Sequence, residues 1–153
     1  MSAPVLSTRS GGCLCGAVRF TAGLTKHEFG ACHCEMCRRW TGSALLGITV
    51  PRSNVEWQGE GNIARFQSSG WAERAHCGTC GSPLYYHFTS DGPMADTLEF
   101  PIGLFDDSNG LTFTNEIFID HKPDSFAYTG EHPRLTRKQT MAKFGISEEE
   151  TPQ

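Results

Sequence analysis

The chain has 153 residues, a length at which one domain is common and a second has little room. Hydrophobic residues make up 38% of it and charged residues 20%, a balance that excludes a wholly disordered chain. The 13 Lys and Arg residues against 17 Asp and Glu residues give a net charge of −4, which disfavours nucleic acid as a partner.

The sequence shows neither a membrane span nor an export signal. The longest apolar runs, at residues 44–47 and 100–104, are far shorter than the roughly 20 residues that a spanning helix needs. The opening residues, MSAPVLSTRS, lack the basic start and the continuous apolar stretch of a signal peptide. We therefore expect a cytoplasmic protein with no membrane partner.

Glycines and prolines divide the chain into short segments rich in β-branched and aromatic residues, which is typical of short strands. After a flexible segment at 1–10, residues 17–21 predict a strand with Val18 and Phe20 on one face. A helical pattern follows at 35–40. The apolar run at 44–50 ends at a proline and predicts a buried strand.

The second half of the chain continues this pattern. Further strands are expected at residues 55–57, 63–66, 84–88, 97–102 and 116–119. A second helix is expected at 135–144, because Gly145 is suited to end it, and an acidic tail at 146–153 is expected to fray. The sequence thus predicts a mainly β (β-rich α+β) protein of short antiparallel sheets, with one domain over residues 11–145.

Seven cysteines are a high number for a chain expected in a reducing compartment. Clustered cysteines there bind metal or do chemistry more often than they form disulfides, and an odd number would leave one thiol unpaired in a disulfide framework. They form three groups: Cys13 and Cys15; Cys32, Cys34 and Cys37; Cys77 and Cys80.

The outer two groups together supply four thiolates, the number that closes a structural zinc site. Such a site joins residues far apart in the sequence, so Cys13 and Cys15 are expected to meet Cys77 and Cys80 across the fold. In a domain this small the bound zinc would supply folding energy that a limited core cannot.

The central group differs, because three protein ligands leave the fourth position of a tetrahedral zinc open to water or substrate. Cys32, Cys34 and Cys37 therefore predict a catalytic zinc. Three alternatives remain open: a second structural site completed by His33 or another histidine, an iron–sulfur cluster on the same thiolates, and a redox-active dithiol at Cys34 and Cys37.

Residues next to the central cysteines are candidates for contact with a substrate. Arg38 and Arg39 can hold a carboxylate, Thr41 and Ser43 can bind it or cap a turn, and Glu35 is a candidate general base. The aromatic candidates for lining a substrate pocket are Trp40, Tyr85, Tyr86 and Phe88. The alternative is that these side chains belong to the core.

The sequence resembles the glutathione-dependent formaldehyde-activating enzyme family, which also contains centromere protein V. The resemblance rests on GGCLCGAVRF at residues 11–20, on CHCEMCRRWTGS at 32–43, and on residues 69–74 leading into CGTCGS at 77–82. All seven cysteines fall on the cysteine positions of the family.

This resemblance implies an Mss4-like fold of short sheets with two zinc ions per chain, structural on the outer four cysteines and catalytic on the central three. The namesake of the family is credited with joining glutathione to formaldehyde. We therefore expect a zinc-dependent carbon–sulfur lyase-type enzyme that acts on a small-molecule thiol or its aldehyde adduct, with glutathione as a candidate substrate. The alternative is a non-catalytic zinc-binding module that recruits a partner.

Overall fold

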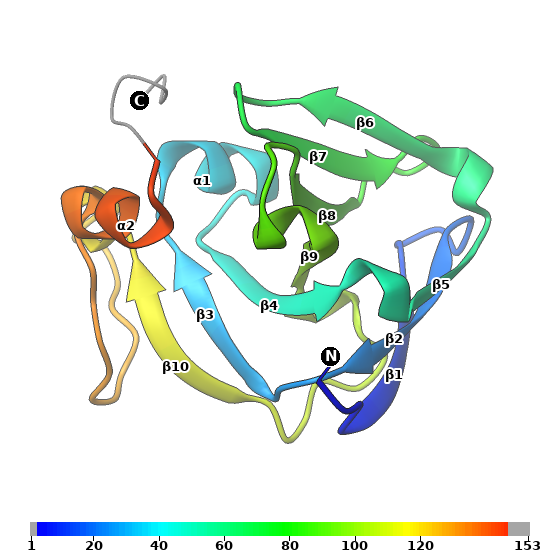
Figure 1. Cartoon of the computed structure of the whole chain (residues 1–153), viewed down its shortest axis with the longest axis horizontal. Coiled ribbons are helices and arrows are strands. Elements are labelled where there is room, and N and C mark those ends of the chain that lie inside the picture. Colours follow the sequence, from blue (N-terminus) through cyan, green and yellow to red (C-terminus); the bar gives the residue numbers. More distant parts are fainter. Residues whose placement is uncertain (1–2, 147–153) are drawn as a thin grey trace.

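The computed structural model describes residues 3–146, which form two β-sheets with the helices near one edge (Figure 1). The smaller sheet has the order β1-β2-β5, with β1 at Ser7–Gly12, β2 at Arg19–Leu24 and β5 at Val55–Gln58. The larger sheet has the order β10-β3-β4-β9-β8-β7-β6. Its strands are β3 Glu28–Cys32, β4 Leu45–Pro51, β6 Ile63–Gln67, β7 Ala72–Cys77, β8 Pro83–Phe88, β9 Thr97–Pro101 and β10 Thr112–Ile117.

Residues 3–146 also form two α-helices and five single turns of 3-10 helix. Helix α1, Glu35–Thr41, follows β3 directly, and α2, Arg137–Phe144, begins at a capping box between Thr136 and Gln139. The 3-10 turns are η1 Arg52–Asn54, η2 Glu60–Asn62, η3 Pro93–Asp96, η4 Ile102–Leu104 and η5 Ile119–His121. Within residues 3–146, no helix has the length and apolar character needed to cross a membrane.

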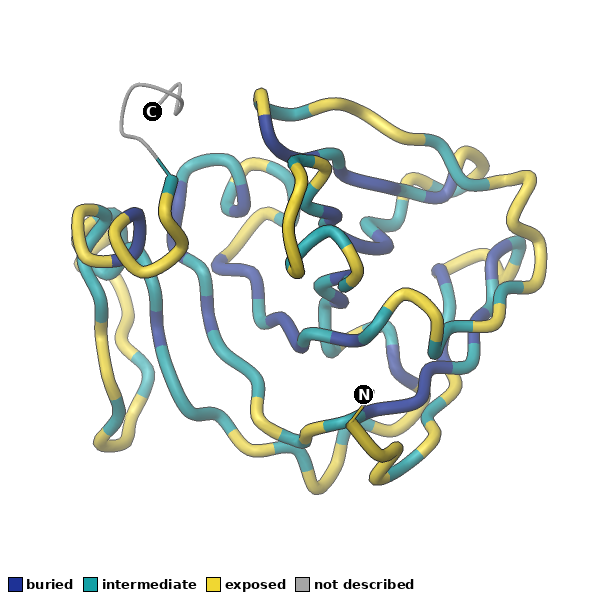
Figure 2. The backbone as a smooth tube through the Cα atoms, viewed as in Figure 1, coloured by how far each residue is buried: buried dark blue, intermediate teal, exposed yellow. Residues whose placement is uncertain are grey.

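The main core lies between the two sheets. Phe20 of β2 packs against Phe100 of β9 with ring centroids 4.7 Å apart and ring planes tilted by 41°, and Ile48 and Val50 of β4 are completely buried. Figure 2 shows the buried stretches along the central strands, whereas the loop that leads to α2 is largely exposed. Because side chains alternate along a strand, the intervening residues of β4 and β9 face away from this core. That second face of the larger sheet is free to carry a site.

The expected mainly β architecture is confirmed, and the seven predicted strands and two helices are all present with shifted ends. Three strands were missed, β1, β3 and β7. Their sequences, STRSGG, EFGAC and AERAHC, contain few β-branched or aromatic residues, so pairing with neighbours rather than local preference makes them strands.

Three details differ from the sequence prediction. Residues 7–10 belong to β1 and pair with β2, so the expected flexible segment 1–10 does not extend that far. Strand β10 begins at Thr112 and runs parallel to β3, whereas all other neighbours are antiparallel. Of the expected tail 146–153, residues 147–153 lie outside the described part.

The turn at Gly59 gives a test of this packing. Gly59 has a φ of 77°, and a Cβ there would lie 1.9 Å from the carbonyl oxygen of Ala17, whereas a Cβ at Gly61 would meet nothing within 4 Å. We expect Gly59→Ala to lower the free energy of unfolding by about 2 kcal/mol or more, and Gly61→Ala to change it by less than about 1 kcal/mol. Denaturant titrations measure both; equal effects would contradict the close approach of these turns.

Candidate metal centres and pocket

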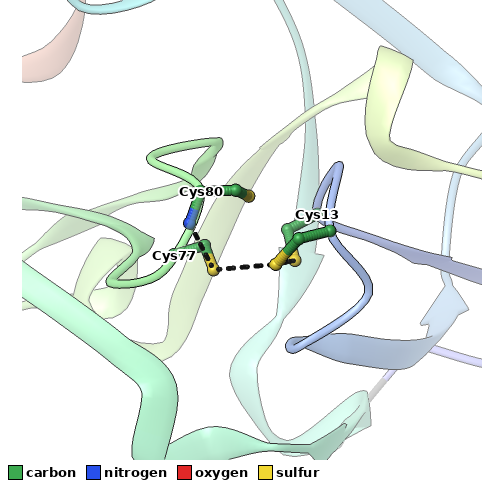
Figure 3. Close-up of side chains that lie close together, drawn as sticks. Cys13, Cys77 and Cys80 are labelled. Atoms are coloured by element: carbon green, nitrogen blue, oxygen red, sulfur yellow. Dashed lines mark hydrogen bonds between the residues drawn. The ribbon is translucent and has the colours of Figure 1, made fainter.

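The outer four cysteines converge as expected, and Figure 3 labels Cys13, Cys77 and Cys80 of this cluster. Cys13 and Cys15 lie in the turn between β1 and β2, Cys77 ends β7, and Cys80 lies in the following turn. Their four Sγ atoms lie within 4.8 Å of one another, with Cys15 3.6 Å from Cys13 and 3.8 Å from Cys77. A tetrahedral ion with metal–sulfur bonds of about 2.3 Å places its sulfurs about 3.8 Å apart, so this cluster can hold one.

Backbone and hydroxyl groups support the negative charge of these sulfurs. The N–H of Val18 donates to Cys13 Sγ at 3.3 Å, and the N–H of Cys80 donates to Cys77 Sγ at 3.4 Å. Hydrogen bonding by Ser82 lowers the pKa of Cys80 to about 5, so its thiolate persists at neutral pH. Metal ligands must be deprotonated, and this environment favours that form at Cys80.

The central three cysteines form a second cluster at the start of α1. Cys32 is the last residue of β3, Cys34 caps the helix, and Cys37 lies in its first turn. Their Sγ atoms also lie within 4.8 Å of one another, and within residues 3–146 no His, Asp, Glu or further Cys joins the group. The donor set therefore suits a metal ion with one position left for another ligand.

Arg74 of β7 is the positive group beside this cluster. Its side chain is buried, and Nη1 donates to Cys37 Sγ at 3.5 Å. The rings of Trp40 and Tyr86 hold the guanidinium, each centroid 5.0 Å from its central carbon, while Nε donates to Ser68. This arrangement fixes a permanent positive charge next to the three cysteine sulfurs.

The three central thiols titrate together. Hydrogen bonds from the thiols of Cys32 and Cys37, aided by the Cys37 N–H and the charge of Arg74, lower the pKa of Cys34 although burial opposes this. The same coupling raises the pKa of Cys32. The first thiolate of the metal-free cluster is therefore Cys34, which is a ready first ligand for an ion.

A cavity of about 550 Å³ opens over the central cluster, on the face of the larger sheet opposite the core. Cys32, Cys34 and Cys37 line one part of it, and apolar side chains form most of the remaining wall. Those apolar residues include Phe29, Met36, Trp71, Phe88, Met94, Phe118, Met141 and Phe144. The volume and lining fit a small-molecule ligand whose reacting group faces the cysteines.

Behind the cluster lies a buried ionic network centred on Glu116 of β10. His33, which stands between two cysteines, turns its ring away from them and places Nε2 2.7 Å from Glu116 Oε1. His132 Nε2 lies 2.6 Å from Oε2, and Arg134 Nε donates to the same oxygen at 2.9 Å. Burial alone would raise the pKa of Glu116, but its hydrogen bonds to these three side chains lower it. His33 is thus occupied with Glu116 rather than with the thiolates.

The other sequence candidates have separate positions. Arg38, Arg39, Thr41 and Ser43 do not line the cavity; Arg39 pairs with Glu35 at 2.9 Å, and the Thr41 hydroxyl bonds to backbone oxygens. Among the aromatic candidates, Tyr86 and Phe88 line the cavity, Tyr85 belongs to the core, and Trp40 packs on Arg74.

Sequence reasoning missed four residues around the cluster: Arg74, Glu116, His132 and Arg134. Arg74 carried a weak signal, since it stands with Glu73 between two alanines of the segment that forms β7. The residues of the network come from distant segments, and no spacing pattern links them.

Comparisons with known proteins give three findings. The family model described as glutathione-dependent formaldehyde-activating enzyme matches residues 8–121. A Schizosaccharomyces pombe protein named an uncharacterized lyase is 29% identical over 131 residues, or 86% of this chain and 93% of that protein. A crystal structure of a Rhodobacter sphaeroides protein has a TM-score of 0.54 and 21% identity, covering 82% of this chain and 98% of that chain. With the two cysteine clusters in place, the strand-rich fold agrees with the expected Mss4-like class.

Replacement of Glu116 tests the buried network. Glu116→Gln leaves Arg134 without its carboxylate, so we expect a loss of about 3 kcal/mol in the free energy of unfolding at pH 7. Because the pKa of Glu116 is lowered in the folded protein, its contribution is complete above the ordinary value of 4.5 and is lost below it. The difference in the free energy of unfolding between Glu116→Gln and wild type should therefore shrink as the pH falls below 4.5.

Urea titrations at several pH values measure this difference. Glu131→Gln, an exposed change next to His132 in the loop before α2, serves as the control and should alter stability by less than about 0.5 kcal/mol. Equal stability of Glu116→Gln and wild type at pH 7 would contradict the role assigned to the network.

Proposed function

Since the chain belongs to the glutathione-dependent formaldehyde-activating enzyme family, we propose that it is a zinc-dependent lyase that makes or breaks a carbon–sulfur bond. Its substrate would be a thiol or the adduct of that thiol with an aldehyde, with glutathione and formaldehyde as the first pair to test. The name of the Schizosaccharomyces pombe relative supports the same reaction class.

One observation carries the proposal: three convergent cysteine sulfurs, lacking a fourth protein ligand within residues 3–146, line a cavity of ligand size. On this proposal Cys32, Cys34 and Cys37 hold the catalytic zinc, and Cys13, Cys15, Cys77 and Cys80 hold a structural zinc. A bound zinc would supply Lewis acidity, which favours the thiolate form of a substrate at neutral pH.

The residues of the chain would position the substrate, supply positive charge and exclude water. Addition of a thiol to an aldehyde removes the thiol proton, forms the C–S bond and gives a proton to the carbonyl oxygen. Negative charge on sulfur and then on oxygen is favoured by the fixed guanidinium of Arg74. Apolar walls such as Trp71 and Phe88 exclude water and strengthen that interaction.

We further propose that residues 11–145, together with β1, act as a single zinc-binding domain in the cytoplasm. Two clusters of free thiols support this setting, because they persist in a reducing compartment. The substrate contacts first expected at Arg38, Arg39, Thr41 and Ser43 are instead proposed for the residues that line the cavity.

Exchange NMR at equilibrium tests the reaction directly. The uncatalysed addition of formaldehyde to glutathione sets a background rate of exchange between the free aldehyde and its adduct. Catalysis requires that the purified, metal-loaded protein increase this rate in proportion to its concentration. If no thiol and aldehyde pair exchanges faster with the protein than without it, the proposed activity is wrong.

Loss of one central ligand should separate catalysis from folding. We expect Cys34→Ser to abolish turnover while circular dichroism stays unchanged and mass spectrometry finds one metal ion retained, since the outer cluster is intact. The matched variant Cys77→Ser opens the outer cluster and should lose ordered structure. Full turnover in Cys34→Ser would contradict the catalytic role of the central cluster.

The charge of Arg74 should matter for rate. Arg74→Met keeps much of the side-chain volume but removes the guanidinium, so kcat/KM should fall about 100-fold, with partial recovery in Arg74→Lys. Arg52→Met, at an exposed site outside the cavity, is the control and should leave kcat/KM within about twofold. Equal rates for Arg74→Met and wild type would remove Arg74 from the mechanism.

A further inference from the structure

Two glycines face each other in the wall of the cavity formed by the sheet. Gly30 of β3 and Gly47 of β4 are direct partners in the antiparallel ladder and line the cavity together. Directly opposed residues place their side chains on the same face of a sheet. Because neither glycine has a side chain, the surface of β3 and β4 is low here, and it forms a shallow trough bordered by side chains of β10 and β9. We call this the glycine trough.

Polar side chains occupy both edges of the glycine trough. A Cβ at Gly30 would lie 2.2 Å from Asn115 Oδ1, and a Cβ at Gly47 would lie 3.1 Å from Glu99 Oε1. The side-chain amide oxygen of Asn115 in β10 therefore lies beside Gly30. The carboxylate of Glu99 in β9 lies beside Gly47. Thr49, the ladder partner of Glu99, donates to Glu99 Oε2 at 2.7 Å and fixes that carboxyl group.

The carboxyl group of Glu99 has no positively charged partner among the described residues. Among the described residues, no Lys, Arg or His approaches it within 4.0 Å, and Thr49 engages only one of its oxygens. Burial raises the pKa of Glu99 despite Thr49 and the distant charge of Lys26. A desolvated acid that faces a cavity gains most from a ligand that brings positive charge and N–H donors.

We propose that the glycine trough, with Glu99, Thr49 and Asn115 at its edges, binds the ammonium group of an aminothiol substrate. An ammonium group offers three N–H donors, and the carboxylate, hydroxyl and amide oxygens of the trough offer matching acceptors. The inference rests on the proposed function, because the sulfur of the same molecule would reach the central cysteine cluster.

Sheet geometry sets the length of that substrate. Cys32 is paired with Leu45, and Gly30 with Gly47, so the cluster and the trough are two residues apart along both strands. At about 3.3 Å per residue this separation is about 7 Å. A chain of about four carbons between sulfur and nitrogen spans it.

Calorimetric titration of the metal-loaded protein with two thiols of equal heavy-atom number tests the inference. The probes are 4-aminobutane-1-thiol and 1-pentanethiol, which differ only in the terminal ammonium and methyl groups. We expect the aminothiol to bind about 10-fold more tightly, the gain typical of a charge-assisted hydrogen bond. Equal or tighter binding of pentanethiol by the wild type would overturn the inference.

Variants locate the source of the preference. Glu99→Gln should reduce the ratio of the two dissociation constants to about 1 without weakening pentanethiol, since the shape of the site is kept. Gly47→Ala, which adds a methyl group beside Glu99, should also weaken the aminothiol selectively. Glu56→Gln removes the same charge from an exposed position of β5 outside this cavity and should keep the ratio. An unchanged ratio in Glu99→Gln would assign the preference elsewhere and refute the inference.

A probe without sulfur separates this inference from the proposed function. If neither thiol binds, the thiol site of the proposed function is wrong, and n-butylammonium then decides the fate of the trough alone. Saturable NMR shifts at the Gly30 and Gly47 amides, absent in Glu99→Gln, would uphold the ammonium site. Their absence in the wild type would overturn it.

Discussion

Close packing of ionisable sulfurs is the constraint on which the rest of this structure depends. Seven cysteines from three segments form two clusters, and in each the Sγ atoms lie within 4.8 Å of one another. Thiolates this close repel one another unless a cation lies among them or positive groups surround them. The outer cluster thereby ties the turn after β1 to the end of β7, so a metal ion there would join the two sheets.

The central cluster is supported from two sides by different means. On the cavity side Arg74 places its guanidinium against Cys37, held between Trp40 and Tyr86. On the opposite side Glu116 engages His33, so the residue between Cys32 and Cys34 is fixed without occupying a ligand position. Both supports are buried, and each keeps the three sulfurs oriented toward the cavity.

Alternation of side chains along the strands explains how one sheet contributes one face to the core and the other face to the cavity. In β4 and β9, Ile48, Val50 and Phe100 pack into the core, while Thr49 and Glu99 point to the cavity. The central cluster lies at the end of β3 and the start of α1, next to this polar face. A ligand can therefore contact the cysteines and the sheet at once, and substitutions at Thr49 or Glu99 would leave the core packing intact.

Much of this organisation is local in the sequence. Cysteine spacing predicted the division into four and three. Two cysteines that stand two or three residues apart on one turn can bind one ion whatever surrounds them. Strands such as Leu84–Phe88 were predicted because their side chains themselves favour extended structure. Strands β3 and β7 were not, because only pairing with their neighbours makes them extended.

The surroundings of the central cluster depended on tertiary structure. Glu116 meets His33 from 83 positions away, and Arg74 reaches Cys37 from 37 positions away. The residues next to the cysteines in sequence, Arg38 and Arg39, lie outside the cavity lining. Sequence by itself predicted which cysteines gather in each cluster, since the pairs and the triplet come from short spacings. Only the folded sheet decided which charges face the sulfurs, because it sets strand order and register.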